Sequence, residues 1–336
     1  MSSERSFARF AIRVAFTFVI VLAFALGGFV IYRMSARARQ TEERITRLSA
    51  QVGRLSQEQA MPAVIVARHR ASICYIYALY SLNPPPGHPF LRPLRTRVSG
   101  SGFLVARGMI ATNRHVAQPW FDDDEDAAQI AKGYTPKLEK LLAFFPGHVQ
   151  PVDLTVAALS QTADLALVRF TPTAETAALR SLPLAASAPI PGGAVIVVGY
   201  PMGVTAMLAK SPRKVYKRLA YSHDTIDIAS DLAAHYLIRP SATYGHLGDV
   251  VEDKLIYDAP TAQGGSGGPV FDTNGDVIGV NSAYIDGFAG GTLGVSARAL
   301  KPLLWQAQHP GVREATGAVP EPSSPDGVQT ATDSQH

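Results

Sequence analysis

An uncharged run of 19 residues near the N-terminus, residues 14–32, limits most strongly how this chain can fold. As a helix this run would be about 28 Å long, close to the hydrocarbon thickness of a bilayer. We therefore predict a transmembrane anchor within residues 1–33. A cleaved signal peptide is the alternative, because Ala36-Arg37-Ala38 has the form of a cleavage site. We favour an uncleaved anchor, since the run is longer than a signal-peptide core and Arg33 precedes that site.

Arginines flank this run on both sides and account for much of the formal net charge of +4. They are Arg5, Arg9 and Arg13 before it, and Arg33, Arg37 and Arg39 after it. We interpret the basic character as membrane flanking and expect no nucleic-acid partner. The two flanks are nearly equal in charge, so the positive-inside rule does not fix the orientation. Because a long domain after a single anchor usually crosses the membrane, we expect it on the periplasmic, extracytoplasmic side of a bacterial inner membrane.

Residues 34–60 are polar and rich in Arg, Glu and Gln, which predicts a helical stalk. Ile45, Leu48, Val52 and Leu55 follow the a and d spacing of two heptads. Two heptads are short for an independent coiled coil, so we favour an isolated helix. Self-association of the stalk into a homo-oligomer is the alternative.

Residues 61–310 contain short apolar runs separated by turn residues, and the whole chain has 28 Gly and 24 Pro. This pattern is typical of an all-β sandwich or barrel. The predicted strands include 72–80, 102–106, 109–112, 165–170, 194–198, 255–257, 269–271 and 277–281, with a hairpin at Asn274-Gly275. Residues 122–143 and 204–237 are predicted to be helical insertions, and residues 311–336 a disordered tail.

Cys74 is the only cysteine, which excludes an intramolecular disulfide, and we expect it to be buried in a strand.

The most specific motif is the segment Gln263-Gly264-Gly265-Ser266-Gly267-Gly268-Pro269-Val270. Acyl transfer requires a nucleophile on a tight turn with backbone N–H groups directed at a developing oxyanion. Glycines around Ser266 allow such a turn, and the N–H groups of Gly264 and Ser266 would be the oxyanion donors. A phosphate-binding loop is disfavoured, because a strand-like Pro-Val-Phe follows instead of a helix.

Two further motifs precede this serine in the chain. His115 follows a predicted strand in Ala111-Thr112-Asn113-Arg114-His115-Val116, and is the predicted general base. Asp164 begins the apolar strand Ala163-Asp164-Leu165-Ala166-Leu167-Val168 and is the predicted acid that orients the histidine. Asp153 is the nearest competitor for that role. The order His, Asp, Ser differs from that of α/β-hydrolases and subtilisins and matches that of chymotrypsin-like enzymes.

Over roughly residues 95–305 the sequence resembles the HtrA (Deg) branch of the trypsin-like serine proteases. The matching segments are the three motifs above together with Gly100-Ser101-Gly102-Phe103, Leu182-Pro183-Leu184-Ala185, Gly199-Tyr200-Pro201-Met202-Gly203 and Val277-Ile278-Gly279-Val280-Asn281. The resemblance implies a chymotrypsin-like fold of two perpendicular six-stranded antiparallel β-barrels, residues 61–188 and 189–310. Its cleft would hold His115 and Asp164 from the first barrel and Ser266 from the second. The short polar tail after Gly311 leads us to expect no PDZ domain.

The same resemblance places the base of the specificity pocket at Pro260, with Val280, Asn281 and Ser282 as a wall. Because no carboxylate occupies Pro260, we expect cleavage after small or medium apolar residues. The acidic run at residues 122–126 lacks the alternating ligand spacing of a calcium loop, so we interpret it as a solvated loop. We assign no metal and no organic cofactor.

These features predict a membrane-anchored serine endopeptidase acting on proteins or peptides, in envelope protein quality control or regulated proteolysis. The alternative is a catalytically silent or latent binding or regulatory protein on the same scaffold, in which an insertion or a distorted oxyanion loop blocks the site.

Overall fold

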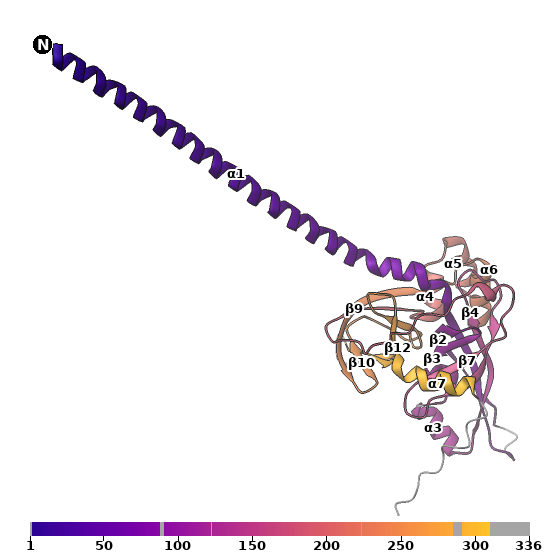
Figure 1. The fold of residues 1–336 in the computed structure, drawn as a ribbon. Coiled ribbons are helices and arrows are strands. Elements are labelled where there is room, and N and C mark those ends of the chain that lie inside the picture. Colours follow the sequence, from indigo (N-terminus) through magenta and orange to yellow (C-terminus); the bar gives the residue numbers. More distant parts are fainter. Residues whose placement is uncertain (1, 88–90, 122, 223, 285–290, 310–336) are drawn as a thin grey trace, which may run out of the picture. The chain divides into compact units, whose positions relative to one another are not determined.

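The computed structural model describes residues 2–87, 91–121, 123–222, 224–284 and 291–309. Of these, residues 2–16, 19, 54–59, 283 and 284 are described by their backbone alone. The chain divides into two compact units, Met1–Met61 and Pro62–His336 (Figure 1). The predicted disordered tail at residues 311–336 lies outside the described residues.

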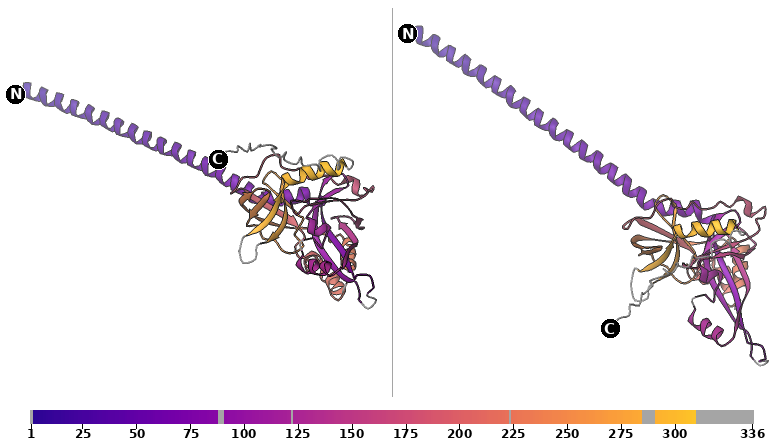
Figure 2. Two further views of the ribbon diagram at one scale, coloured as in Figure 1. Left: turned by 90° about the horizontal axis from the view of Figure 1, so that it is seen from below. Right: turned by 60° about the horizontal axis from the view of Figure 1, so that its bottom comes forward.

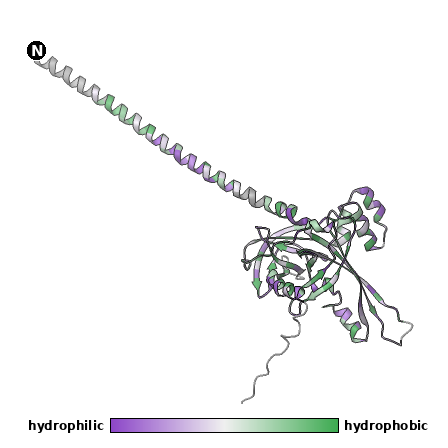
Figure 3. Cartoon of the chain, turned by 45° about the vertical axis from the view of Figure 1, so that its right-hand side comes forward, coloured by the Kyte–Doolittle hydropathy of each residue, from purple (hydrophilic) through white to green (hydrophobic). Residues whose placement is uncertain are grey.

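The first unit lies within a single helix, α1 (Ser2–His69). The helix includes a stretch that is long and apolar enough to cross a membrane. In Figure 3 the apolar stretch of α1 is green, and a mostly hydrophilic stretch follows it. Both the predicted anchor and the predicted stalk are therefore helical, and they are continuous with one another.

The first half of the second unit forms one antiparallel sheet with the order β5-β4-β1-β2-β3-β7-β6. Its strands are β1 (Ile73–Asn83), β2 (Leu94–Ala106), β3 (Met109–Thr112), β4 (Thr135–Phe144), β5 (Val152–Asp153), β6 (Thr155–Leu159) and β7 (Ala166–Arg169). Apolar side chains from these strands form a buried core that includes Cys74, Ile76, Leu104, Ile110 and Phe145. The prediction that Cys74 is a buried thiol is confirmed.

Leu154 alone separates the two edge strands β5 and β6 along the chain. β5 pairs with β4 and β6 pairs with β7. The Leu154 N–H donates a 2.8 Å hydrogen bond to the Leu141 carbonyl. The two edges of this seven-stranded sheet are therefore joined through Leu154, and the sheet forms the first barrel of the fold.

The second half forms a closed barrel with the order β10-β13-β12-β11-β8-β9. Its strands are β8 (Ala194–Gly199), β9 (Ser241–Val251), β10 (Lys254–Tyr257), β11 (Pro269–Phe271), β12 (Val277–Tyr284) and β13 (Thr292–Ser296). The β11–β12 hairpin turns at Asn274-Gly275, where Gly275 has a φ of +85°. Together the two barrels confirm the predicted all-β, chymotrypsin-like fold. The helix α7 (Leu300–Gln308), yellow in Figure 2, follows the second barrel and packs on β6 and β7 of the first.

The prediction of a helical insertion over residues 122–143 is wrong in its second half. A helix, α3 (Asp124–Ala131), is present, but residues 135–144 form β4 and pair with β1. The charged residues Lys137, Glu139 and Lys140 suggested a solvated helix, whereas the apolar end of β4 is buried in the barrel. Within the acidic run, Asp123 caps α3 by accepting from the Asp126 N–H, and the buried Asp126 accepts from the Tyr80 hydroxyl.

The insertion at residues 204–237 is helical, as predicted. It contains α4 (Gly203–Ala209), α5 (Arg213–Leu219) and α6 (Thr225–Ala234), which connect β8 to β9. Asp224 caps α6 through the Ile226 N–H. The first helix of the insertion, α4, begins three residues after Tyr200 and is preceded by Met202, whose N–H donates to the Gln263 carbonyl.

Tyr200 joins the two barrels. It follows β8 of the second barrel, and its buried hydroxyl donates a 2.9 Å hydrogen bond to the Ile73 carbonyl of the first. We predict that Tyr200→Phe lowers the free energy of unfolding by about 1–3 kcal/mol, because the substitution keeps the ring and leaves a buried carbonyl without a donor. Urea unfolding would measure this, with Tyr216→Phe on the exposed surface of α5 as the control. An equal effect of both substitutions would contradict the role of this hydrogen bond.

Candidate active site

His115 lies in a short helix directly after a buried strand. The strand β3 ends at Thr112, Asn113 is the N-terminal cap, and α2 (Arg114–Ala117) follows. Val116 and Ala117 point into the core, which holds the helix in place, whereas His115 stays partly exposed. The Asn113 Nδ2 donates a 2.7 Å hydrogen bond to the Asp164 carbonyl and so ties this turn to the start of β7.

Asp164 contacts His115 through both carboxylate oxygens. The His115 Nδ1 lies 2.8 Å from Oδ2, and the His115 backbone N–H donates to Oδ1 over 3.0 Å. An ionised carboxylate can only accept, so the proton of this hydrogen bond is on Nδ1, and Nε2 is the ring nitrogen that does not contact Asp164. The competing residue Asp153 lies in β5, where it pairs with Leu142. The structure thus brings together His115 and Asp164, as predicted.

The pKa of Asp164 is lowered from its ordinary value of 3.8. Burial is the largest single influence and raises this pKa. The hydrogen bond and charge of His115, the Ser282 hydroxyl and the His115 N–H all lower it, and together they outweigh burial. Asp164 is therefore ionised at neutral pH and can stabilise a positive charge on His115.

Ser282 connects this acid to Ser266. Its hydroxyl donates a 2.6 Å hydrogen bond to Oδ2 of Asp164, and its backbone carbonyl accepts a 2.7 Å hydrogen bond from the Ser266 hydroxyl. Among the described residues, this is the hydrogen bond that the Ser266 hydroxyl makes, rather than one to His115. The sequence had suggested that Ser282 is a pocket wall. No short motif marks its contact with Asp164, because 118 residues separate the two.

The glycines around Ser266 are required by close backbone approaches. Gly264 and Gly267 have φ values of +91° and +88°. A Cβ atom on Gly267 would lie 2.0 Å from the Ser101 carbonyl oxygen, and one on Gly264 would lie 2.7 Å from the Tyr200 carbonyl oxygen. Neither position could hold a larger residue without moving the backbone.

The two predicted oxyanion donors are available. In the described part of the chain, neither the Gly264 N–H nor the Ser266 N–H has a hydrogen-bond partner, whereas the N–H groups of Gly265, Gly267 and Gly268 are all bonded to backbone carbonyls. This difference leaves two donors beside the Ser266 hydroxyl that can bind a negative charge.

Ser101 of β2 holds this turn from the first barrel. Its N–H donates to the Ser266 carbonyl over 2.7 Å, and its hydroxyl donates to the Gly264 carbonyl over 2.8 Å. The same hydroxyl accepts a 2.9 Å hydrogen bond from the Tyr200 N–H. Ser101 is fully buried. The sequence pointed to it only as part of the Gly100-Ser101-Gly102-Phe103 motif, with no role assigned.

The predicted pocket residues differ in accessibility. Pro260 is exposed and Ser282 is partly exposed, whereas Val280 and Asn281 are fully buried. The Asn281 side chain accepts from the Tyr257 hydroxyl and donates to the Thr261 hydroxyl, so it supports the loop before Ser266. A cleft of about 530 Å³ opens beside the His115–Asp164 pair, lined also by Ser282, Glu252 and Leu293.

Comparison with known proteins adds a family relationship. Residues 100–280 match the family model described as a trypsin-like peptidase domain. No curated protein sequence matches the chain. Among solved structures, the serine endoprotease from Yersinia pestis is 16% identical, with 75% of this chain and 67% of that chain covered and a TM-score of 0.47. The active form of the Rv3671c protease from M. tuberculosis is 18% identical, with 72% and 83% covered and a TM-score of 0.46.

We predict that Ser101→Ala lowers the reactivity of Ser266 toward a fluorophosphonate about tenfold, because Gly264 loses its buried donor and the Tyr200 N–H loses its acceptor. Ser99→Ala, two residues earlier in the same strand, removes a single hydrogen bond to Tyr75 and serves as the control. Equal labelling rates in the two variants would show that Ser101 does not position the turn.

We also predict a pH-dependent effect of Ser282→Ala on stability. Removing this donor moves the pKa of Asp164 back toward its ordinary value of 3.8. A lowered pKa stabilises the fold above that value, and the stabilisation is lost as the pH falls through the pKa of the folded state. The variant should therefore be less stable than the parent by about 1–2 kcal/mol at pH 7, and the difference should shrink below about pH 4.

Unfolding by urea across this pH range would measure that difference. Ser72→Ala is the matched control, since its hydroxyl donates to the uncharged Arg180 carbonyl and its effect should not depend on pH. A constant difference for Ser282→Ala would contradict the coupling to Asp164.

Proposed function

The chain belongs to the trypsin-like peptidases and is a serine endopeptidase, and we propose that it hydrolyses peptide bonds with His115, Asp164 and Ser266 as its catalytic triad. The observation that supports this assignment best is the hydrogen-bonded pair of His115 and Asp164, together with a serine turn in which two N–H groups have no partner among the described residues. The family match covers the segments that contain all three residues.

In the proposed first half of the reaction, the Ser266 Oγ attacks the carbonyl carbon of the scissile bond and its proton passes to Nε2 of His115. Asp164 accepts the hydrogen bond from the Nδ1–H of His115 and stabilises the imidazolium. The carbonyl oxygen becomes an oxyanion, which the N–H groups of Gly264 and Ser266 bind. Loss of one such donor typically costs about 3–4 kcal/mol of transition-state stabilisation.

The tetrahedral intermediate then collapses as the C–N bond breaks. His115 gives its proton to the leaving amine, and the acyl group remains on Ser266. In the second half, His115 takes a proton from water, which attacks the acyl carbon. Collapse of the second intermediate returns the proton to Ser266 and releases the new carboxyl end of the substrate. Neither half of the reaction requires a cofactor.

A latent or silent binding protein on the same scaffold is the second candidate, and one observation favours it. The Ser266 hydroxyl is bonded to the Ser282 carbonyl and not to His115. Rotation about one side-chain torsion redirects a serine hydroxyl, so this arrangement is consistent with a resting enzyme as well as with a silent one. The insertion α4–α6 adjoins the serine turn, because the Met202 N–H donates to the Gln263 carbonyl.

We propose that residues 1–33 anchor the protein in a membrane, that residues 34–60 form a stalk and that residues 61–310 form the protease domain. The apolar stretch of α1 supports the anchor, and the division between Met61 and Pro62 supports the domain boundary. We place the protease domain on the extracytoplasmic side of a bacterial inner membrane, where it would act in protein quality control or regulated proteolysis. A pocket at Pro260 without a carboxylate suits small or medium apolar residues before the scissile bond.

We predict that the full chain in detergent reacts covalently with a fluorophosphonate at Ser266, and that Ser266→Ala abolishes labelling. The same substitution should lower peptide turnover by about 10⁴-fold or more, because it removes the attacking oxygen and leaves only the residual catalysis by the oxyanion donors and substrate binding. Mass spectrometry of the labelled peptide and hydrolysis of a fluorogenic peptide library would measure these effects. Turnover that persists in Ser266→Ala would exclude this nucleophile, and a folded parent that is never labelled would favour the silent protein.

A further inference from the structure

The stalk carries an apolar stripe in a single heptad register. Between Arg33 and Gly53 the large apolar residues are Met34, Ile45, Leu48 and Val52. With Ile45 at position a, Leu48 and Met34 fall at d and Val52 at a. The same register places Leu55 at d, so the stripe covers residues 34–55 of the stalk. The core positions of this stripe that lack a large apolar residue are Ala38 at a and Thr41 at d.

The described side chains of this stripe are exposed to solvent in the single chain. Met34, Ile45, Leu48 and Val52 have exposed fractions of 65%, 59%, 60% and 61%. Scattered surface apolar residues require no explanation, but here every large apolar side chain of a polar segment lies on one line of one helix. We propose that residues 34–55 of two copies of this chain form a parallel, two-stranded coiled coil.

The charges beside the stripe favour the parallel arrangement. In the same register Arg37 occupies position g and Glu42 position e. In a parallel pair, position g of one helix faces position e of the next heptad in the other helix, so Arg37 meets Glu42 of the second copy in two symmetric contacts. An antiparallel pair would bring like charges together. Arg37 and Glu42 are five residues apart and so cannot meet within one helix.

The side-chain shapes and the anchor support the same pairing. β-branched Ile45 and Val52 at a, with Leu48 at d, favour two strands over three. Copies anchored in one membrane by the same N-terminal segment have the same orientation and equal distances from the bilayer, so their stalks meet in parallel and in register. Confinement to the membrane also raises the effective concentration. This last step rests on the proposed anchor, whereas the pattern and the charges do not.

Cysteine crosslinking of the full chain in detergent tests the proposal. Identical d residues face each other in a parallel, in-register pair, so Leu48→Cys should form a disulfide-linked dimer in most of the chains under mild oxidation. Ala50→Cys, at the outward position f, is the matched control and should stay largely uncrosslinked. The native Cys74 is fully buried and does not compete. Equal crosslinking at both positions, or none at Leu48→Cys, would overturn the proposal.

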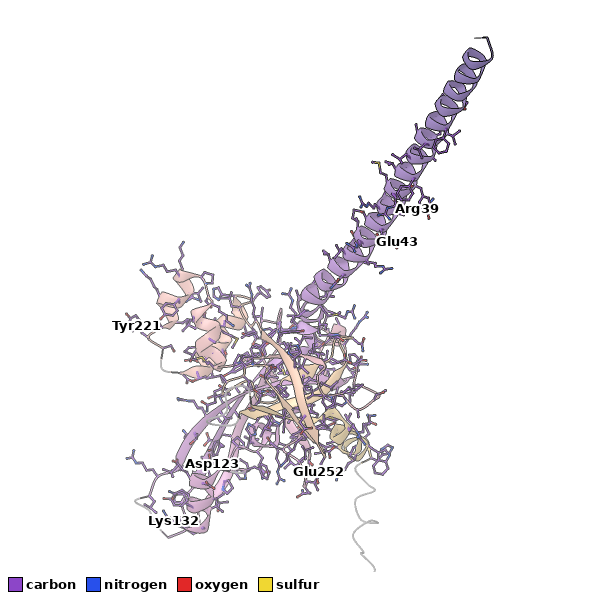
Figure 4. All side chains as sticks on the ribbon, turned by 90° about the vertical axis from the view of Figure 1, so that its left-hand side faces the viewer. Arg39, Glu43, Asp123, Lys132, Tyr221 and Glu252 are labelled. Atoms are coloured by element: carbon purple, nitrogen blue, oxygen red, sulfur yellow. The ribbon has the colours of Figure 1, made fainter. Side chains whose placement is uncertain are left out.

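A second set of variants avoids altering the apolar stripe. Arg37→Glu should weaken the dimer about tenfold, because both contacts then place two carboxylates together. The double exchange Arg37→Glu with Glu42→Arg should restore it, and Arg39→Glu, at the outward position b, should have no effect (Figure 4 labels Arg39). Analytical ultracentrifugation should give a mass of two copies for the parent. A mass of one or three copies, or no rescue by the double exchange, would overturn the proposal. None of these measurements involves Ser266, so their failure leaves the proposed function untouched.

Discussion

The position of the serine turn depends on the hydrogen bonds of Ser101. This residue belongs to the first barrel, yet its N–H and hydroxyl bond to the carbonyls of Ser266 and Gly264 in the second. In the part of the chain that the structure describes, the N–H groups of the same two residues have no hydrogen-bond partner. The close approach also explains Gly267, where any side chain would meet the Ser101 carbonyl. The conformation of the serine turn, and with it the position of the proposed oxyanion donors, thus depends on how the two barrels meet.

Ser282 gives the site a second connection between the barrels. Its hydroxyl stabilises the charged form of Asp164 from the first barrel, and its carbonyl holds the Ser266 hydroxyl of the second. One residue therefore contacts the acid and the proposed nucleophile through different atoms. Because the hydroxyl contact is to a charged group and the carbonyl contact is to a neutral one, only the first depends on the ionisation of Asp164. A change in the ionisation of Asp164 would therefore affect the contact that orients His115 without directly affecting the hydrogen bond of the Ser266 hydroxyl.

The sequence predicted the parts of the site that lie in short motifs. The segments of His115, Asp164 and Ser266 each combine a strand end with a turn, and the structure brings His115 and Asp164 into contact as expected. Ser101 and the contact of Ser282 with Asp164 were missed, because their partners lie far away in the sequence. Strand β4 was taken for a helix because Lys137, Glu139 and Lys140 are charged, and β9 was missed because Gly245, Gly248 and several polar residues interrupt its apolar pattern. β4 is a strand because it pairs with β1, and β9 is a strand because it pairs with β8. Such pairing partners cannot be deduced from local composition.

The stability of the stalk helix in water needs a physical explanation. Helices in water owe most of their stability to the packing of an apolar face, and a polar helix that packs on nothing has only its intrinsic propensity to hold it together. Gly53 and several β-branched residues reduce that propensity here. Continuation from a membrane-embedded helix removes the cost of nucleation at one end, but adds no contacts along the stalk. A second copy supplies contacts at Ile45, Leu48 and Val52, so the proposed pairing accounts for the apolar stripe and for the continuity of α1.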